Sequence, residues 1–394
     1  MRLFAFVVAL APSFALAQPP PPRAPSGCTT VSDTEMECWG PAHPQAGPVQ
    51  IGLGSDFGCG LAANGTVRCW GRSDDGQCGV VTGSVPTPRE VESLDRVAAL
   101  GVGYAHACAL REGGEVWCWG DGGHGQLGVE IEARATPARV ADLSDVRQIA
   151  VGGFHNCALR GDGAVLCWGS NDAGNLGDGG EREHRATPMP VRGIRATEIW
   201  SGQSFTCARE RRGVKCWGLS EHGQAGTRRR VRAARPTRLA GVGPRDAVVL
   251  AESFGCALAS GRLRCWGNNL FNVDGAVSMH PQAVEVPSWR GVAQLSARTE
   301  DLCGVREGRV SCQGVNRRDH LRVPTTEAGQ VVSDPSEMPG ITDAVEVVTG
   351  WFTQCLRHDD GAWSCWGWNR GARVGAVGVG SSEDRVVTPT RLPW

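Results

Sequence analysis

Cysteine is the residue of this chain whose spacing points most directly to chemistry, because thiols form disulfides, bind metals or act as nucleophiles. The chain has 17 cysteines, and all but one fall into pairs whose members are nine or ten positions apart. In CALREGGEVWCWG, at 108–120, a glycine-containing stretch separates the two cysteines and Trp-Gly follows the second. Zinc sites use shorter Cys-x2-Cys spacings and histidine clusters. The pattern therefore favours disulfides and predicts no metal site.

The spacing within each pair follows the length of the turn that it encloses. Pairs ten positions apart enclose a three-residue turn ending in glycine, as in Ala63-Asn64-Gly65, whereas Cys256 and Cys265 enclose only Ser260-Gly261. The thiols therefore stay opposite each other on antiparallel strands, close to disulfide distance. The turn at Arg211-Arg212 fits this scheme less well. The predicted disulfides are Cys28–Cys38, Cys59–Cys69, Cys108–Cys118, Cys157–Cys167, Cys207–Cys216, Cys256–Cys265, Cys303–Cys312 and Cys355–Cys365.

Cys78 is the cysteine left without a partner. Its segment DGQCG aligns with HGQLG and AGNLG, so that Cys78 takes the place of Leu127 and Leu176. A cysteine in a leucine position is most simply a small buried apolar residue. We therefore predict a free, buried thiol at Cys78, with a reactive thiol as the alternative.

A repeat of 49 residues organises the chain, as Trp70, Trp119, Trp168, Trp217 and Trp266 show. Gln313 takes the next tryptophan position. One repeat unit, 97–142, contains four short segments with strand-like alternation, separated by glycine-rich turns. Four antiparallel strands repeated radially form a propeller blade, so an all-β fold is predicted.

The repeat reads V-x-x-I/L-x-x-G, H-x-C-A-L, G-x-V-x-C-W-G, G-Q-L-G and P-x-x-V in order, and it resembles the regulator of chromosome condensation repeat family. The resemblance covers residues 49–394, is strong at 97–190 and is weak at 296–340. It implies a seven-bladed β-propeller of four-stranded antiparallel blades, with one predicted disulfide per blade. The chain is identified as an exported, bacterial-type, disulfide-rich member. The hairpin at 28–48 is then extra; it closes the ring, caps an edge or begins a partial eighth blade.

The N-terminal residues predict export. Residues 1–17 combine Arg2, a short apolar stretch and Ala15-Leu16-Ala17, which is the pattern of a signal peptide. A proline-rich linker follows at 18–27 and precedes the hairpin and the propeller at 49–394. The expected location is therefore the periplasm, the cell surface or the medium, where disulfides persist. No apolar run is long enough for a membrane span.

Two departures from the repeat are candidates for binding a partner. Arg228, Arg229, Arg230 and Arg232 form a basic run in one glycine-rich loop. Trp351 and Trp368 belong to an aromatic excess in the last repeat unit. A solvated loop is the alternative for the arginines, and a ring-closing seam is the alternative for an aromatic group that also includes Trp363 and Trp394.

The sequence predicts a binding scaffold rather than an enzyme. A net charge of −1 argues against nucleic acid, and no catalytic motif, cofactor site or metal site is recognised. His106 and His155 recur at one repeat position and are interpreted as internal hydrogen-bonding residues. We expect a monomer that binds a protein partner through its loops. The alternatives are an enzyme inhibitor, and a lyase or hydrolase of envelope polysaccharide using Glu252, Glu300 or Asp301.

The cysteine pattern can be tested by peptide mapping without reduction. We expect eight local bridges and a single free thiol at Cys78. A bridge that joins two different repeat units, such as one between Cys207 and Cys256, would contradict the pairing.

Overall fold

The computed structural model describes residues 47–180, 183–227, 231–269, 279–316, 321, 330–369 and 376–394, together with the backbone of 28–32 and 35–38. The chain forms two compact units, residues 1–45 and residues 46–394. Within the described part, the second unit consists of seven four-stranded antiparallel sheets. No helix in this part is long and apolar enough to cross a membrane.

The seven sheets follow one another along the chain as blades 1 to 7. Blade 1 contains β3 (Gln50–Leu53), β4 (Phe57–Leu61), β5 (Val67–Ser73) and β6 (Gly83–Glu90). Blade 2 contains β7 (Val97–Val102), β8 (His106–Arg111), β9 (Val116–Asp121) and β10 (Ala133–Arg139). Blade 3 contains β11 (Val146–Val151), β12 (His155–Arg160), β13 (Val165–Ser170) and β14 (His184–Pro190). Blade 4 contains β15 (Glu198–Ser201), β16 (Phe205–Glu210), β17 (Gly213–Leu219) and β18 (Arg232–Leu239).

The remaining three blades have the same composition. Blade 5 contains β19 (Ala247–Leu250), β20 (Phe254–Ala259), β21 (Arg262–Asn268) and β22 (Met279–Arg290). Blade 6 contains β23 (Gln294–Arg298), β24 (Asp301–Arg306), β25 (Arg309–Val315) and β26 (Val331–Glu337). Blade 7 contains β27 (Ala344–Thr349), β28 (Thr353–His358), β29 (Trp363–Trp368) and β30 (Arg385–Arg391).

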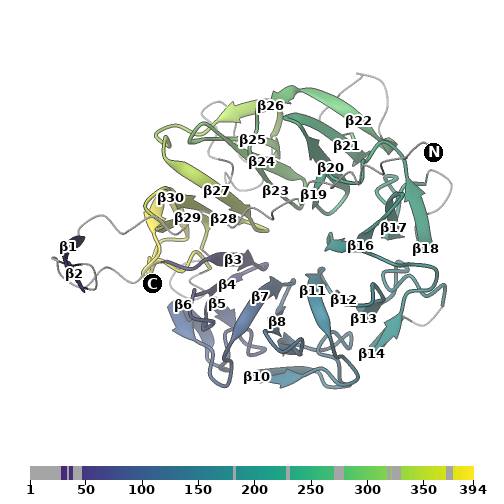
Figure 1. Cartoon of the computed structure of the whole chain (residues 1–394), viewed down its shortest axis with the longest axis horizontal. Coiled ribbons are helices and arrows are strands. Elements are labelled where there is room, and N and C mark those ends of the chain that lie inside the picture. The colour runs from purple at the N-terminus through teal and green to yellow at the C-terminus, as the bar shows by residue number, and fades with distance from the viewer. Residues whose placement is uncertain are drawn as a thin grey trace, which may run out of the picture. The chain divides into compact units, whose positions relative to one another are not determined.

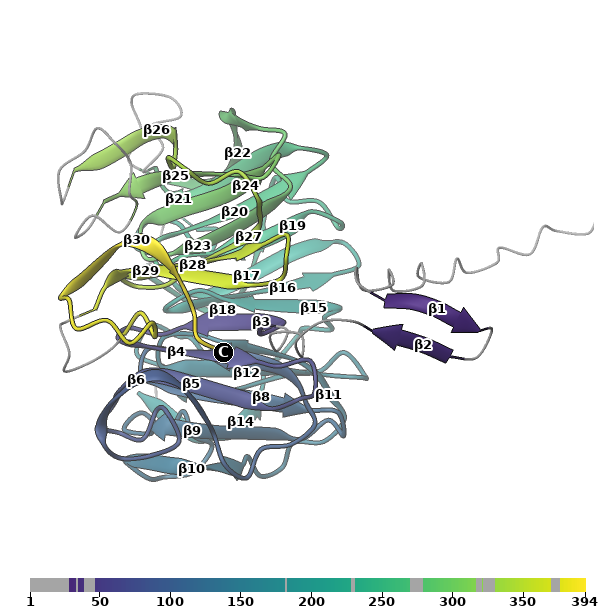
Figure 2. The same ribbon diagram turned by 90° about the vertical axis from the view of Figure 1, so that its left-hand side faces the viewer.

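The blades form a ring with their first strands toward the middle and their fourth strands outside (Figure 1). Seen from the side, the strands of neighbouring blades follow one another around the ring (Figure 2). Every sheet pairs its strands in chain order, so each blade is made from one continuous segment. The predicted seven-bladed propeller is confirmed.

The second and third strands of every blade carry the paired cysteines. Cys157 lies opposite Cys167, for example, and the Cα atoms of the bridged pairs are 4.0–4.1 Å apart. The structure contains the seven predicted bridges within the propeller. In the separate hairpin, the register of β1 (Cys28–Ser32) and β2 (Glu35–Cys38) places Cys28 opposite Cys38. The side chains of this pair lie outside the described residues, so the eighth bridge stays a prediction.

The turns between these strands match their sequences. Gly65 ends a three-residue turn at φ +83°, in the left-handed region that favours glycine. Ser260 and Gly261 both have positive φ, 49° and 72°, as a type I′ turn requires. In blade 4, Glu210 pairs with Gly213, so the turn is formed by Arg211-Arg212 and Gly213 adopts a φ of +128°.

The hydrophobic core lies between neighbouring blades. Trp119 of blade 2, for example, packs with Phe57 and Cys78 of blade 1 in one buried cluster. Its indole Nε1 donates to the carbonyl oxygen of Gln77 in the GQCG segment of blade 1, at 2.9 Å. The same bond recurs from Trp168 to Gln126, from Trp217 to Asn175 and from Trp266 to Gln224, at 2.9–3.0 Å. In blades 2 to 5, the repeat tryptophan therefore joins its blade to the preceding one.

Gln313 interrupts this pattern in blade 6, and a different tryptophan compensates for it. Trp289, in the outer strand of blade 5, is 2% exposed and donates to Oε1 of Gln313 at 2.5 Å. A Cβ atom at Gly304 would come within 2.7 Å of the Trp289 ring, so the glycine makes room for it. The indole is therefore kept at this boundary, although a different strand provides it.

The ring closes where blade 7 meets blade 1, and two of the surplus aromatic residues lie there. Trp363 is 1% exposed, and its Nε1 donates to the Pro48 carbonyl oxygen at 2.6 Å. A Cβ atom at Gly60 would meet the Trp394 ring at 2.7 Å, and the Arg68 guanidinium lies 5.3 Å from its centroid. These two tryptophans belong to the seam. The hairpin β1–β2 forms a sheet of its own and contributes no strand to a described blade.

The hydrogen bond between blades can be measured by comparing two tryptophans. Trp168 donates to Gln126, whereas Nε1 of Trp70 is buried without a partner among the described residues. Trp168→Phe should therefore lower the free energy of unfolding by about 0.5–1.5 kcal/mol more than Trp70→Phe, because it removes a buried hydrogen bond that Trp70 does not make. The Gln126 carbonyl keeps the bond that it accepts from Asn156 Nδ2 at 2.8 Å. Denaturant titration of the oxidised proteins measures both values. Equal losses would show that only ring packing matters.

Candidate functional site

A channel runs along the axis of the ring, between the first strands of the seven blades. The cavity measures about 350 Å³, and all seven first strands contribute to its wall. Each of these strands is the innermost edge of its sheet. Edge strands present backbone N–H and C=O groups that their own sheet does not use. The channel wall is therefore built from strand edges together with aliphatic side chains such as Leu100, Val151 and Leu250.

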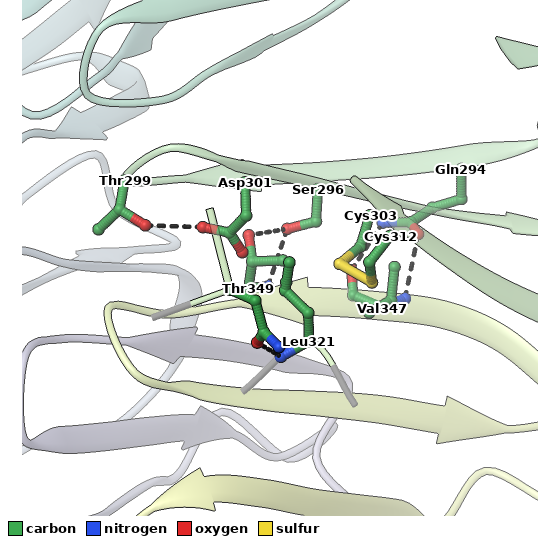
Figure 3. The surroundings of a disulfide bond; sticks show 10 residues. Gln294, Ser296, Thr299, Asp301, Cys303, Cys312, Leu321, Val347 and Thr349 are labelled. Atoms are coloured by element: carbon green, nitrogen blue, oxygen red, sulfur yellow. Dashed lines mark hydrogen bonds between the residues drawn. A yellow bond between two sulfur atoms is a disulfide. The ribbon is translucent and has the colours of Figure 1, made fainter. Parts of the chain in front are cut away.

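Glutamine side chains join neighbouring first strands at the channel. The amide of Gln294 in β23 donates to the Val347 carbonyl of β27 and accepts from the Val347 N–H, both at 3.0 Å. Figure 3 shows this pair beside the hydroxyl contact between Ser296 and Thr349, 3.0 Å long. Gln50 joins Leu100, and Gln148 joins Ile199, in the same two-bond manner. The first strands of neighbouring blades belong to different sheets and do not pair through their backbones. Each glutamine side chain supplies two hydrogen bonds between them instead.

The segments that connect first and second strands converge at one end of the channel; we call them the turn ring (residues 54–56, 103–105, 152–154, 202–204, 251–253, 298–300 and 350–352). Backbone hydrogen bonds link successive turns, including Tyr104 N–H to Gly153 O at 2.9 Å and Gly153 N–H to Gln203 O at 2.8 Å. The packing is tight, because a Cβ atom at Gly152 would lie 2.9 Å from the Gly202 oxygen. Six of the seven turns begin with glycine or alanine.

Arg298 occupies the corresponding place in blade 6. Its Nη2 lies 3.5 Å from the carbonyl oxygen of Val102, which belongs to blade 2. Blades 2 and 6 are not neighbours, so the guanidinium must cross the axis of the ring. Burial lowers the pKa of Arg298 to about 10, against the opposing charges of Asp301 and Glu252. The side chain therefore remains a cation at neutral pH, at the end of the channel.

Aromatic side chains surround this cation on the turn ring. Tyr104 stacks on Phe154 with ring centroids 5.1 Å apart and meets the edge of Trp351 at 4.9 Å. The Arg298 guanidinium lies 6.0 Å from the centroid of the Trp351 ring. Tyr104, Phe154 and Trp351 are each partly exposed. Three blades thus supply one aromatic cluster, which we call the Tyr104 cluster (Tyr104, Phe154 and Trp351).

The acidic residues considered for catalysis lie in the turn ring or beside it. Asp301 is fully buried and accepts a hydrogen bond from Thr299 Oγ1 at 2.6 Å (Figure 3). The Gln203 amide, oriented to donate, lies 2.9 and 3.0 Å from the two carboxylate oxygens of Glu252. Glu300 follows in the turn of blade 6. Among the described residues that line the channel there is no carboxylate. The geometry therefore does not bring a pair of carboxylates together in the cavity.

His106 and His155 are buried beneath the turn ring and bond to the next blade. Nε2 of His106 lies 2.9 Å from Asn156 Oδ1, and Nε2 of His155 lies 2.8 Å from Thr206 Oγ1. Burial lowers the pKa of His106 to about 4 and that of His155 to about 3. Both imidazoles are therefore neutral at physiological pH, and their contacts are internal hydrogen bonds.

The predicted partner-binding residues are spread over the molecule. Arg228, Arg229 and Arg230 lie outside the described residues. Arg232 begins the outer strand β18, is exposed, and donates to the Asp172 carbonyl oxygen at 3.4 Å. Trp351 belongs to the turn ring, whereas Trp368 ends β29 and is partly exposed.

Cys78 is free and fully buried in the core between blades 1 and 2. Burial raises the pKa of its thiol to about 12. The thiolate that a nucleophile or metal ligand needs is therefore not populated at neutral pH. No group of three or more potential metal ligands occurs among the described residues.

Sequence reasoning missed Arg298 and the three channel glutamines. Arg298 could have been found by aligning the turns, because it alone places a long side chain where six other units have glycine or alanine. It lies in the least regular repeat, where such a departure is easily read as drift. The glutamines recur four residues before the same position in blades 1, 3 and 6.

Comparison with known proteins identifies the repeat and the fold. The model of the regulator of chromosome condensation (RCC1) repeat matches residues 64–110, 113–159 and 162–209, and a second model of the same repeat matches 49–77, 97–126 and 146–175. No curated protein sequence matches the chain.

Solved structures with this fold share about a fifth of their residues with the chain. Prp20p from Saccharomyces cerevisiae superposes with a TM-score of 0.70 and 21% identity, over 84% of this chain and 87% of that one. Human WBSCR16 superposes with a TM-score of 0.72 and 20% identity, over 83% of this chain and 94% of that one. The yeast RCC1 (Prp20) bound to Kap60 gives 0.71 and 20%, over 92% and 90%. At these identities the likeness establishes the fold alone.

The buried histidines predict a loss of stability in acid. Their folded-state pKa values lie below the unfolded value near 6.5, so only the unfolded chain takes up protons as the pH falls below 6.5. The stability contributed by each neutral histidine is present above pH 6.5, and about 2.5 kcal/mol of it should be lost by pH 4.5. Denaturant titration at a series of pH values measures this slope.

Phenylalanine at the same repeat position provides the control, since Phe57, Phe205 and Phe254 begin the second strands of blades 1, 4 and 5. A quadruple variant removes both imidazoles and the polar side chains that they contact. Its substitutions are His106→Phe, Asn156→Ala, His155→Phe and Thr206→Gly. This variant should have a flatter pH dependence between pH 6.5 and 4.5. A slope equal to that of the parent would assign the acid sensitivity to other groups.

Proposed function

We propose that this chain, which belongs to the regulator of chromosome condensation (RCC1) repeat family, is an exported scaffold that binds a protein partner through the turn ring of its propeller. The observation that supports this most directly is the Tyr104 cluster, which is partly exposed and comes from three blades. Residues that serve only the repeat recur in each blade, whereas these three positions differ. Aromatic residues with an adjacent arginine are the side chains most often found at the energetic centre of protein interfaces.

Export is supported by the disulfides and by the N-terminal sequence. Seven bridges within one propeller suit an oxidising compartment. The signal-peptide pattern at 1–17 supports the same location. Such a scaffold does not rely on net charge to attract its partner, because the formal charge of the whole chain is −1.

Related folds make protein binding a reasonable expectation. The Prp20p structure is described together with its binding to Gsp1p and histones, and yeast RCC1 (Prp20) has been solved with Kap60 bound. A catalytic function is less well supported, because the described lining of the channel includes no carboxylate. The wide, partly exposed turn ring is better suited to a macromolecule than to a small substrate.

Truncating the cluster should weaken binding of the partner. The partner is first recovered from an envelope extract with the oxidised mature protein. Trp351→Ala should then raise its dissociation rate roughly tenfold or more, as expected when an interface anchor is removed. Surface plasmon resonance measures the rates. The control is Val331→Ser, which changes a 54%-exposed side chain in the outer strand β26.

The basic run is tested with the same partner. Replacing Arg228, Arg229 and Arg230 with serine should slow association and flatten its dependence on salt if these charges guide the encounter. Folding should be unchanged in both variants. If Trp351→Ala binds like the parent, the turn ring is not the interface. If only the arginine variant binds more weakly, the basic run itself is the docking surface.

A further inference from the structure

Arg298 has an unusual shortage of partners for a half-buried guanidinium. Its five N–H groups make one hydrogen bond, the 3.5 Å contact from Nη2 to the Val102 oxygen. Nε is buried and has no partner in the described part of the chain. No described carboxylate forms an ion pair with it, and Glu252 and Asp301 act only at longer range. The side chain is only partly exposed, so its unused N–H groups are incompletely hydrated, and an anion that accepts from them would stabilise it.

The other polar side chains of the channel wall already have partners. Ser296 bonds to Thr349, and Gln148 uses its amide oxygen and nitrogen on the Ile199 backbone. Ser201 lies 3.4 Å from the hydroxyl of Thr206. Among the residues that line the channel, Arg298 is therefore the cation with N–H groups that make no hydrogen bond to the described residues. It lies where the channel meets the turn ring.

We propose that the axial channel binds the end of an extended peptide, with the guanidinium of Arg298 pairing with the C-terminal carboxylate. Planar guanidinium and carboxylate groups form strong charge-assisted hydrogen bonds, which suits the end of a chain. Apart from the backbone groups of Leu100, Ile199 and Val347, which the glutamines already use, the strand edges along the channel offer donors and acceptors at the spacing of an extended peptide. A cavity of about 350 Å³ has room for a few residues in single file but not for a loop that doubles back.

The channel site adjoins the proposed interface at Arg298, whose guanidinium lies 6.0 Å from the centroid of the Trp351 ring, but the two use different surfaces. The channel is enclosed by the first strands, whereas the Tyr104 cluster lies on the turns beyond them. The chain end would enter where the first strands begin and stop at Arg298. The inference therefore goes beyond the proposed function and does not require the partner to be known.

The test uses the oxidised full-length propeller and a degenerate tripeptide mixture without cysteine, prepared with free and with amidated C-termini. Equilibrium dialysis read by mass spectrometry gives the bound fraction of each. The free acids should be retained at least roughly tenfold more than the amides, because amidation removes the charge that Arg298 pairs with. Equal retention of acids and amides, or no retention of either, would overturn the proposal.

Two variants assign the effect to Arg298. Arg298→Gly restores the residue that begins five of the other turns, and Arg298→Gln keeps a polar side chain without the charge. Both should keep the parent's circular dichroism spectrum and lose the preference for free acids, and the control Val331→Ser, in the outer strand β26, should retain it. A preference that survives in Arg298→Gly would place the carboxylate elsewhere. Displacement of the peptides by equimolar inorganic phosphate would identify a site for free anions and would also overturn the proposal.

Discussion

The hydrogen bond from the repeat tryptophan to a carbonyl of the preceding blade, made in blades 2 to 5, determines how one sheet meets the next there. An indole between two sheets fills the space that a twisted blade leaves at its neighbour, and its N–H donates across the boundary between them. The acceptor is the backbone of the GQLG segment, as in Trp168 and Gln126. The tight turn of that segment, with Gly125 at φ +74°, holds the carbonyl in place. Between blades 5 and 6 the contact is different, because Trp289 of blade 5 donates to the Gln313 side chain of blade 6.

Toward the axis, polar side chains take over the role of the indoles. Gln294 pairs with the backbone of the next first strand, and His155 bonds to Thr206 of the next blade. Phenylalanine replaces histidine where the next blade offers no polar partner, as Phe205 does opposite Gly255. Near the axis, the contacts between neighbouring blades therefore differ from one pair of blades to the next. Arg298 departs from this scheme because its one hydrogen bond among the described residues is with blade 2, which does not adjoin blade 6.

Local spacing was sufficient to predict the blades, the seven disulfides within them and the glycine turns. These features depend on residues within about ten positions of one another, where strand register leaves few alternatives. The seam formed by Trp363 and Pro48 could not be derived, because it joins residues 315 positions apart. Of the Tyr104 cluster only Trp351 was predicted, and Tyr104, Phe154 and the residues that line the channel were missed for the same reason. Their members are single residues of different repeats, and only the closed ring brings them together.

Every bridge closes a loop of nine or ten residues inside one hairpin, and every blade is one continuous stretch of chain. The native partner is therefore the nearest thiol in sequence throughout the propeller, except at Cys69, which lies nine positions from the free Cys78 and ten from its partner Cys59. A chain that emerges N-terminus first can oxidise each hairpin as soon as it appears, without waiting for distant segments. Blade 7 also needs no strand from the N-terminus to be complete. The blades can then form in the order of synthesis. The ring closes last, through side-chain contacts such as the bond from Trp363 to the Pro48 carbonyl oxygen.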